Sequence, residues 1–199
     1  MKNNKGFTLI ELVVVLSLLG IVLAGVLTFL GYFLGVFGDT KARTIVQDDV
    51  NNVLRILAND IRSATKPDLT YKSIVIYKAN DESHKGDRID IFDYKNNKYY
   101  LISYKYENNV LYRGITDAET ADHIVKATVK YSVLLEGIIH PSESELFETD
   151  SEIFEDLTSD PKSDRRTIKI NLIAKDKEGK IKKPVVISAT YTSRSKGAP

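Results

Sequence analysis

Residues 5–20 read KGFTLIELVVVLSLLG, and this stretch decides what kind of fold the chain forms. A short basic N-terminus leads into an apolar run, and residues 12–38 carry no charged side chain. That run exceeds the roughly 20 residues that a membrane-spanning helix requires. Positive charge ahead of it keeps the N-terminus on the cytoplasmic side. Glu11 is the one charge between Lys5 and the end of the apolar run.

Two common kinds of N-terminal segment fit this pattern poorly. A cleaved secretory signal has an apolar core of about 7 to 15 residues and small residues at its cleavage site. Here the core is longer, and Val36-Phe37-Gly38 is a poor cleavage site. An ordinary membrane anchor leaves Glu11 unexplained, because a carboxylate deep in a bilayer costs about 2.5–3.5 kcal/mol.

The octapeptide KGFTLIEL at residues 5–12 resembles the class III leader of type IV prepilins and pseudopilins. The resemblance implies that a membrane-embedded prepilin peptidase cuts between Gly6 and Phe7 on the cytoplasmic side. It also implies that Phe7 becomes the methylated N-terminus, and that residues 1–6 are a leader peptide.

In that family, Glu11 corresponds to a glutamate that pairs with the α-amine of a neighbouring subunit in the filament. A buried carboxylate is tolerated when an opposite charge pairs with it, and the amine of Phe7 exists only after cleavage. In the uncut precursor, Glu11 is instead expected near the cytoplasmic interface, paired with Lys5 or with lipid headgroups.

The first proline after the leader is Pro67, so residues 7–64 are expected to form one long helix. Residues 7–38 form its membrane and assembly part. Residues 39–64 form an amphipathic part, with apolar residues at helical spacing at Val46, Val50, Val53, Leu57, Ile61 and Ala64. Gly31 and Gly35 form a G-x-x-x-G pair, which allows close helix packing. Glycine is also simply frequent in membrane helices, and both explanations stay open.

The globular head, residues 39–199, is expected to pack this helix on antiparallel sheet, which makes the chain an α+β protein with a pilin-like fold. Alternating apolar residues and turn signals predict strands at 73–78, 87–94, 99–106, 110–113, 124–135, 166–175 and 181–193. By pattern, the head resembles the larger minor pilins and the J-type pseudopilins.

Residues 141–164 interrupt the strand pattern with a strongly acidic segment. We expect a solvated surface insertion, in which residues 153–157 form a short helical turn on the head. A weaker hypothesis is a calcium site built from Asp150, Glu152, Glu155 or Asp156, since clustered carboxylates suit hard cations. The spacing of a calcium-binding loop is absent from the segment.

The sequence offers little catalytic chemistry. His84, His123 and His140 lack metal-ligand spacing, and motifs for nucleophilic, phosphate-binding or zinc-dependent catalysis are missing. Asp90 and Asp93 are expected at the surface. The chain contains no cysteine, which excludes disulfides and thiolate ligands. We therefore expect no enzyme activity and no cofactor.

Contact with DNA is the least favoured of the binding hypotheses. Lysines surround the last hairpin, at Lys175, Lys177, Lys180, Lys182 and Lys183, and the meander is rich in tyrosines, at Tyr99, Tyr100, Tyr104 and Tyr106. Basic residues beside aromatic ones can bind single strands. However, acidic residues alternate with these lysines, and the net charge of the chain is only +1.

The sequence thus predicts a minor pilin or pseudopilin subunit of a type IV pilus or related filament. Before assembly it would be a single-pass protein of the cytoplasmic membrane with its head outside the cytoplasm. Its partners would be prepilin peptidase, the membrane and other pilin subunits. The alternatives are a competence-type DNA-uptake pseudopilin and a membrane-anchored binding domain that never polymerises. The sequence does not distinguish a pilus from a type II secretion or competence filament.

Overall fold

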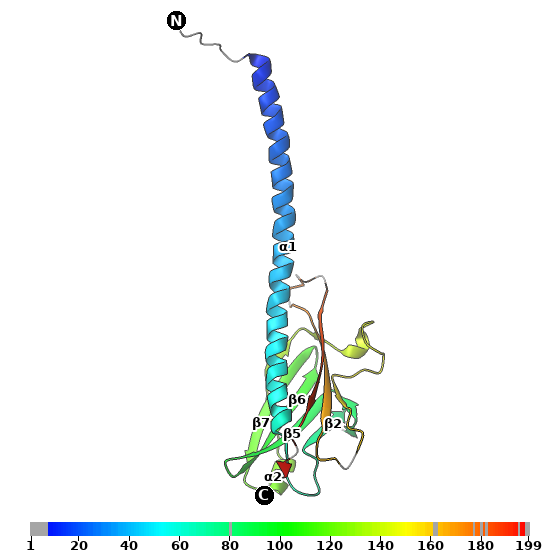
Figure 1. Ribbon diagram of the computed structural model, residues 1–199. Coiled ribbons are helices and arrows are strands. Elements are labelled where there is room, and N and C mark those ends of the chain that lie inside the picture. Colours follow the sequence, from blue (N-terminus) through cyan, green and yellow to red (C-terminus); the bar gives the residue numbers. More distant parts are fainter. Residues whose placement is uncertain are drawn as a thin grey trace. The chain divides into compact units, whose positions relative to one another are not determined.

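The computed structural model describes residues 8–79, 81–160, 163–176, 178–179, 181, 183–194 and 196–197. The chain divides into two compact units, Met1–Lys41 and Ala42–Pro199. A long helix, α1 (Leu9–Ser63), comes first and contributes to both units, and antiparallel sheets follow it in the second (Figure 1). The predicted α+β, pilin-like fold class is confirmed.

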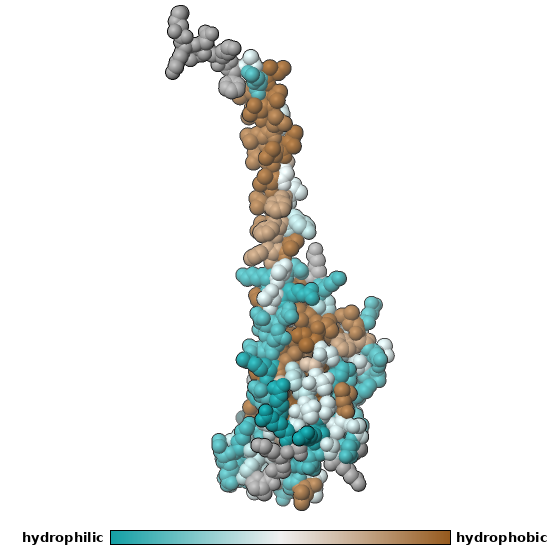
Figure 2. Space-filling view, viewed as in Figure 1, coloured by the Kyte–Doolittle hydropathy of each residue, from teal (hydrophilic) through white to brown (hydrophobic). Residues whose placement is uncertain are grey.

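Helix α1 has two parts of different character. Residues 8–37 are all exposed, and they are apolar over most of the surface shown in Figure 2. From residue 46 onward one face of the helix is buried, through Val46, Val50, Val53, Leu54, Leu57, Ala58 and Ile61. The predicted apolar stripe is therefore the face on which the head packs.

The larger sheet has six strands in the order β3-β2-β5-β6-β7-β8, and every neighbouring pair is antiparallel. Its strands are β2 (Ile74–Lys78), β3 (Asp81–Ser83), β5 (Arg88–Lys95), β6 (Lys98–Glu107), β7 (Val110–Ala118) and β8 (Tyr131–Glu136). Two hairpins turn on asparagine pairs with positive φ, 51° and 62° at Asn96 and Asn97, and 51° and 64° at Asn108 and Asn109. Asparagine tolerates this conformation, which fits the right-handed twist of hairpins.

A second sheet has the order β12-β11-β10-β4, and β9 also pairs with β11. Its strands are β4 (Lys85–Gly86), β9 (Ile138–Ile139), β10 (Phe154–Asp156), β11 (Thr167–Ala174) and β12 (Val185–Thr192). Strands β1 (Thr65–Lys66) and β13 (Lys196–Gly197) form a short parallel pair. The predicted strands at 166–175 and 181–193 correspond to β11 and β12.

The six-stranded sheet is covered on both faces. Ile89 and Ile91 of β5 join the main core with the buried face of α1 and with the second sheet. Phe92 joins a smaller cluster with Leu101 and with Ile124 of helix α2 (Ala121–Val125). Both faces of β5 are therefore buried.

The strand predicted at 124–135 is wrong over its first half. The chain first forms α2, whose Ile124 is fully buried, and only then enters β8 at Tyr131. The reason is tertiary: an apolar patch on the second face of the sheet needs cover, and α2 provides it. Strand β7 also extends beyond its predicted end at residue 113.

The acidic segment is only partly the solvated insertion that the sequence predicts. A short 3-10 helix, η1 (Pro141–Glu143), begins it, but Ile153 and Phe154 are fully buried. Residues 154–156 form β10 between β11 and β4 instead of a helical turn. Cationic partners make this burial tolerable, because Glu155 pairs with Lys169 and Asp156 with Arg166.

Asp90 and Asp93 are buried, contrary to the predicted surface location. Arg88 binds both carboxylate oxygens of Asp90, at 3.1 and 2.6 Å, and Ser103 Oγ donates to the same group at 2.5 Å. Asp93 accepts a hydrogen bond from Ser63 and pairs with Lys95. Both carboxylates are thus structural ion-pair partners in the sheet.

A polar cluster fixes the end of α1 to the six-stranded sheet. The hydroxyl of Tyr104, which is fully buried, donates to Asp60 Oδ2 at 2.5 Å. Arg113 Nη2 donates to the same oxygen at 2.8 Å, and Arg113 Nε donates to the tyrosine hydroxyl oxygen at 2.9 Å. The three side chains come from α1, β6 and β7, so the cluster ties together elements that are distant in sequence.

The burial of Tyr104 leads us to expect that the head loses stability at alkaline pH. Burial, and then the nearby Asp60 carboxylate, raise the pKa of the Tyr104 phenol far above its ordinary value of 10.0. In the unfolded chain the phenol ionises near pH 10, whereas in the folded chain it stays neutral. The stabilisation is therefore complete below about pH 10 and is lost above it, at about 1.4 kcal/mol per pH unit.

Denaturant unfolding of the full chain in detergent, compared with Tyr104→Phe, measures this contribution. The slope of unfolding free energy against pH above pH 10 should be shallower in the variant by about 1.4 kcal/mol per unit. Identical slopes in the two proteins would show that Tyr104 ionises within the fold.

Candidate functional site

The N-terminus of α1 is capped by two local side chains, Thr8 and Glu11. Thr8 precedes the helix, and both its amide N–H and its hydroxyl donate to Glu11 Oε2 at 2.9 Å. The Glu11 amide points back at Thr8 Oγ1 at 3.4 Å. Thr8 and Glu11 therefore form a capping box, which satisfies backbone donors that a helix start leaves free. The Thr-x-x-Glu spacing of Thr8 and Glu11 is a signal for this cap that the sequence already carries.

The capping box does not neutralise Glu11. Thr8 supplies neutral donors, and both of its bonds end on the single oxygen Oε2. The negative charge of the carboxylate is therefore retained. Gly6 and Phe7, which form the predicted cleavage site, lie outside the described residues.

The apolar part of α1 is long and apolar enough to cross a membrane, and its most apolar 18-residue stretch has no buried residue. Phe29, Phe33 and Phe37 stack at i,i+4 spacing, with ring centroids 6.3 and 6.2 Å apart. A Cβ atom added at Gly31 or Gly35 would meet nothing within 4 Å. Contacts among the described residues thus give no reason for glycine there, although each glycine costs about 1 kcal/mol relative to alanine in a helix interior.

The four carboxylates that the sequence suggested as calcium ligands do not converge on one point. Each of them pairs with a different cationic side chain. Asp150 lies 2.7 Å from Lys85, and Glu152 lies 2.6 Å from Lys78. Glu155 and Asp156, as described above, pair with Lys169 and Arg166. This arrangement gives no support to a calcium site. Glu152 lies instead with Asp87 and His140, in a group whose ligand atoms are all within 4.8 Å of one another.

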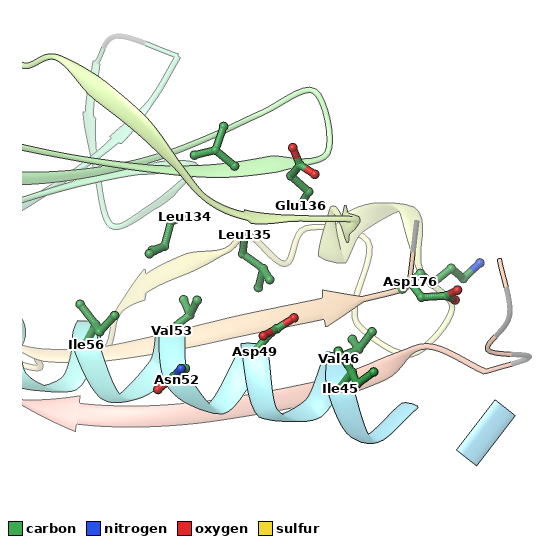
Figure 3. Close-up of a pocket in the computed structure, with 12 residues that line it drawn as sticks. Ile45, Val46, Asp49, Asn52, Val53, Ile56, Leu134, Leu135, Glu136 and Asp176 are labelled. Atoms are coloured by element: carbon green, nitrogen blue, oxygen red, sulfur yellow. The ribbon is translucent and has the colours of Figure 1, made fainter. Parts of the chain in front are cut away.

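A groove of about 610 Å³ lies between α1 and the edge strand β8. Figure 3 shows Val53 and Ile56 on the helix facing Leu134 and Leu135 on β8. Three carboxylates also line it, those of Asp49, Glu136 and Asp176. The lining thus mixes aliphatic and acidic side chains with Asn52 and Lys175, which is the chemistry of a contact surface rather than of a nucleophile and its base.

The basic and aromatic surface considered for DNA is smaller than the sequence suggests. Tyr104 is fully buried and holds Asp60, so its ring is not available for stacking on a base. Lys177, Lys180 and Lys182 lie outside the described residues. Tyr99, Tyr100 and Tyr106 remain partly exposed.

Comparison with known protein families finds a match, and it covers the N-terminal segment. Residues 1–27 match the prokaryotic N-terminal methylation motif, a type IV pilin signature that the long apolar helix fits. No curated protein and no solved structure matches the chain. The match contains the predicted cleavage site and Glu11, whereas the head lies outside it.

Proposed function

We propose that this chain, which carries the type IV pilin signature and is a pilin-like substrate of a prepilin peptidase, is a minor pilin or pseudopilin of a type IV pilus or related filament. The peptidase removes residues 1–6 and leaves Phe7 as the methylated N-terminus. The processed subunit then leaves the membrane and joins other pilin subunits in the filament.

The observation that carries the proposal is the methylation motif on an apolar helix that the described part of the chain does not cover. Residues 8–37 are exposed, and this surface cannot remain in water. A membrane covers it before assembly, and the same helices of neighbouring subunits cover it afterwards. The stacked phenylalanines suit packing between helices, and so do Gly31 and Gly35, where an added Cβ would meet no described atom within 4 Å.

Glu11 is the proposed assembly residue. In the filament the α-amine of a neighbouring Phe7 approaches the carboxylate, and its positive charge offsets the cost of burying the negative one. The capping box prepares the carboxylate for this role, since Thr8 binds Oε2 and orients the group. The uncut precursor has a peptide bond where the amine would be, so cleavage controls the pairing.

The size of the head favours a subunit that is present in few copies in each filament. The acidic segment is built into the second sheet as β10 and adds bulk beside β11. A subunit that repeats along the whole filament must fit beside many copies of itself, which a large head makes difficult. We also propose that the chain acts by assembly and not by catalysis, as expected from its sequence.

Intact mass measurement on protein extracted from membranes tests the processing step. The expected mass lacks Met1–Gly6 and carries one additional methyl group. A matched Gly6→Leu variant, in which a bulky side chain replaces the residue before the cut, should keep its leader and its unmethylated N-terminus. Wild-type protein that retains Met1–Gly6 would contradict the proposal and would favour a non-polymerising membrane-anchored domain.

A further inference from the structure

Asp87, His140 and Glu152 meet on the head although they lie far apart in sequence. Asp87 precedes β5, His140 follows β9, and Glu152 precedes β10. The Nε2 atom of His140 is 2.8 Å from Asp87 Oδ1 and 3.1 Å from Glu152 Oε2. We propose that these three side chains form a binding site for a divalent transition-metal ion of the zinc type.

The spacing of the three atoms suits such an ion. Zinc binds imidazole nitrogen and carboxylate oxygen at about 2.0–2.2 Å, which places neighbouring ligand atoms about 3–3.5 Å apart. Two of the three separations, 2.8 and 3.1 Å, are close to that range, and all ligand atoms lie within 4.8 Å of one another. Small side-chain rotations would therefore admit the ion without movement of the backbone.

The imidazole ring of His140 is already held in a ligand's orientation. Its Nδ1 lies 2.6 Å from Ser142 Oγ, and its ring packs against the ring of Tyr106 with centroids 5.4 Å apart. The backbone N–H of Ser142 also points at Nδ1, at 3.3 Å, so Ser142 fixes the ring from that side. Contacts of this kind orient a histidine so that its other nitrogen is the ligand. Here that other nitrogen is Nε2, which faces both carboxylates.

The charges around the three side chains also favour the binding of a cation. Only 7% of the Glu152 side chain and 12% of the His140 side chain are exposed. Lys78 binds Glu152 through Oε1, so Oε2 is the oxygen directed at His140. Lys78 offsets one of the two carboxylate charges, so a cation held between Asp87 and Glu152 would meet the remaining negative charge.

The mixed donor set selects the kind of metal. Imidazole nitrogen is a ligand for zinc and its first-row neighbours, whereas calcium prefers six to eight oxygen ligands. Three protein ligands leave room for water to complete the coordination. The ion would cross-link Asp87, which precedes β5, to His140 and Glu152 at the acidic segment, and would stabilise that contact. This site is independent of the assembly role of α1.

Titration of zinc into the full chain tests the site. The protein would be purified in detergent, stripped with a chelator and titrated with ZnCl2 by calorimetry, with CaCl2 as the contrasting ion. We expect one zinc site per chain and no calcium binding. Asp87→Asn and His140→Ala should each abolish the zinc site, whereas His123→Ala, which changes an exposed histidine outside the cluster, should leave it intact.

Two further measurements separate ligation from folding. Asp87 is half-exposed and asparagine has its shape, so Asp87→Asn should unfold like wild type without zinc yet lose the rise in Tm that zinc causes in wild type. Ser142→Ala should weaken zinc binding about 10- to 100-fold while keeping one site. Absence of zinc binding to wild type, or binding that persists in both Asp87→Asn and His140→Ala, would overturn the proposal.

Discussion

A chain in which Glu11 is replaced by glutamine is expected to be cut and methylated normally, and to enter filaments at least a hundredfold less than wild type. Glutamine can serve in the capping box as glutamate does, so the start of α1 should be preserved. It carries no charge, however, and the neighbouring α-amine would be buried without its partner. An unpaired buried charge costs about 3–5 kcal/mol, and each 1.4 kcal/mol corresponds to a factor of ten.

The capping box provides the control for this experiment. Thr8→Val removes the hydroxyl that binds Glu11 but keeps the carboxylate, and loss of a cap costs about 1 kcal/mol. This variant should therefore assemble much better than Glu11→Gln. Glu11→Ala loses both the cap and the charge, and should assemble no better than Glu11→Gln.

The measurement compares the amount of each variant in sheared filaments with the amount left in the membrane, in cells that lack the wild-type copy. Intact mass confirms that every variant has lost its leader. Assembly of Glu11→Gln at the wild-type level would show that Glu11 serves the helix start alone. Failure of Thr8→Val to the same degree as Glu11→Gln would show that assembly needs the cap as much as the charge.

The parts of the fold that the sequence predicted are those set by local rules. The absence of proline before Pro67 and the uncharged run at 12–38 define α1, and the apolar spacing from Val46 to Ile61 defines its buried face. The asparagine pair at 96–97 marks a hairpin, because asparagine accepts positive φ. In each case, neighbouring residues alone determine the outcome.

The parts that could not be predicted depend on partners far away in the chain. Phe154 lies in a run of acidic residues that reads as solvated, yet its strand is buried because Lys169 and Arg166 neutralise its carboxylates. His140 has no metal-ligand spacing along the chain, and only the fold brings it within 3.1 Å of Glu152. Sequence spacing detects sites built within one element, and this cluster draws on three segments.

Asp60→Ala is expected to destabilise the head by about 3–5 kcal/mol, more than most single substitutions. Asp60 accepts from the hydroxyl of Tyr104 at 2.5 Å and from Arg113 at 2.8 Å. Its side chain is only 14% exposed, and that of Arg113 is 24% exposed. Removal of Asp60 would leave a largely buried guanidinium without its counterion and a buried hydroxyl without its acceptor, and both are costly.

The matched control is Asp117→Ala. Asp117 pairs with Lys98 at 3.0 Å, but both side chains are 49% exposed, and water therefore competes with the pair. Exposed pairs contribute about 0–1 kcal/mol. Denaturant unfolding of each full-length variant in detergent gives the comparison, with an unchanged denaturant slope as evidence that the same structure is lost.

The double variant Asp60→Leu/Arg113→Met separates the loss of a counterion from the loss of packing. Apolar residues of similar size often replace a buried ion pair at little cost, so the double variant should be more stable than Asp60→Ala. Recovery in the double variant would show that the uncompensated charge of Arg113 causes the damage. If Asp60→Ala is as mild as Asp117→Ala, the cluster does not hold the end of α1 on the six-stranded sheet, and the apolar face from Val46 to Ile61 must hold it unaided.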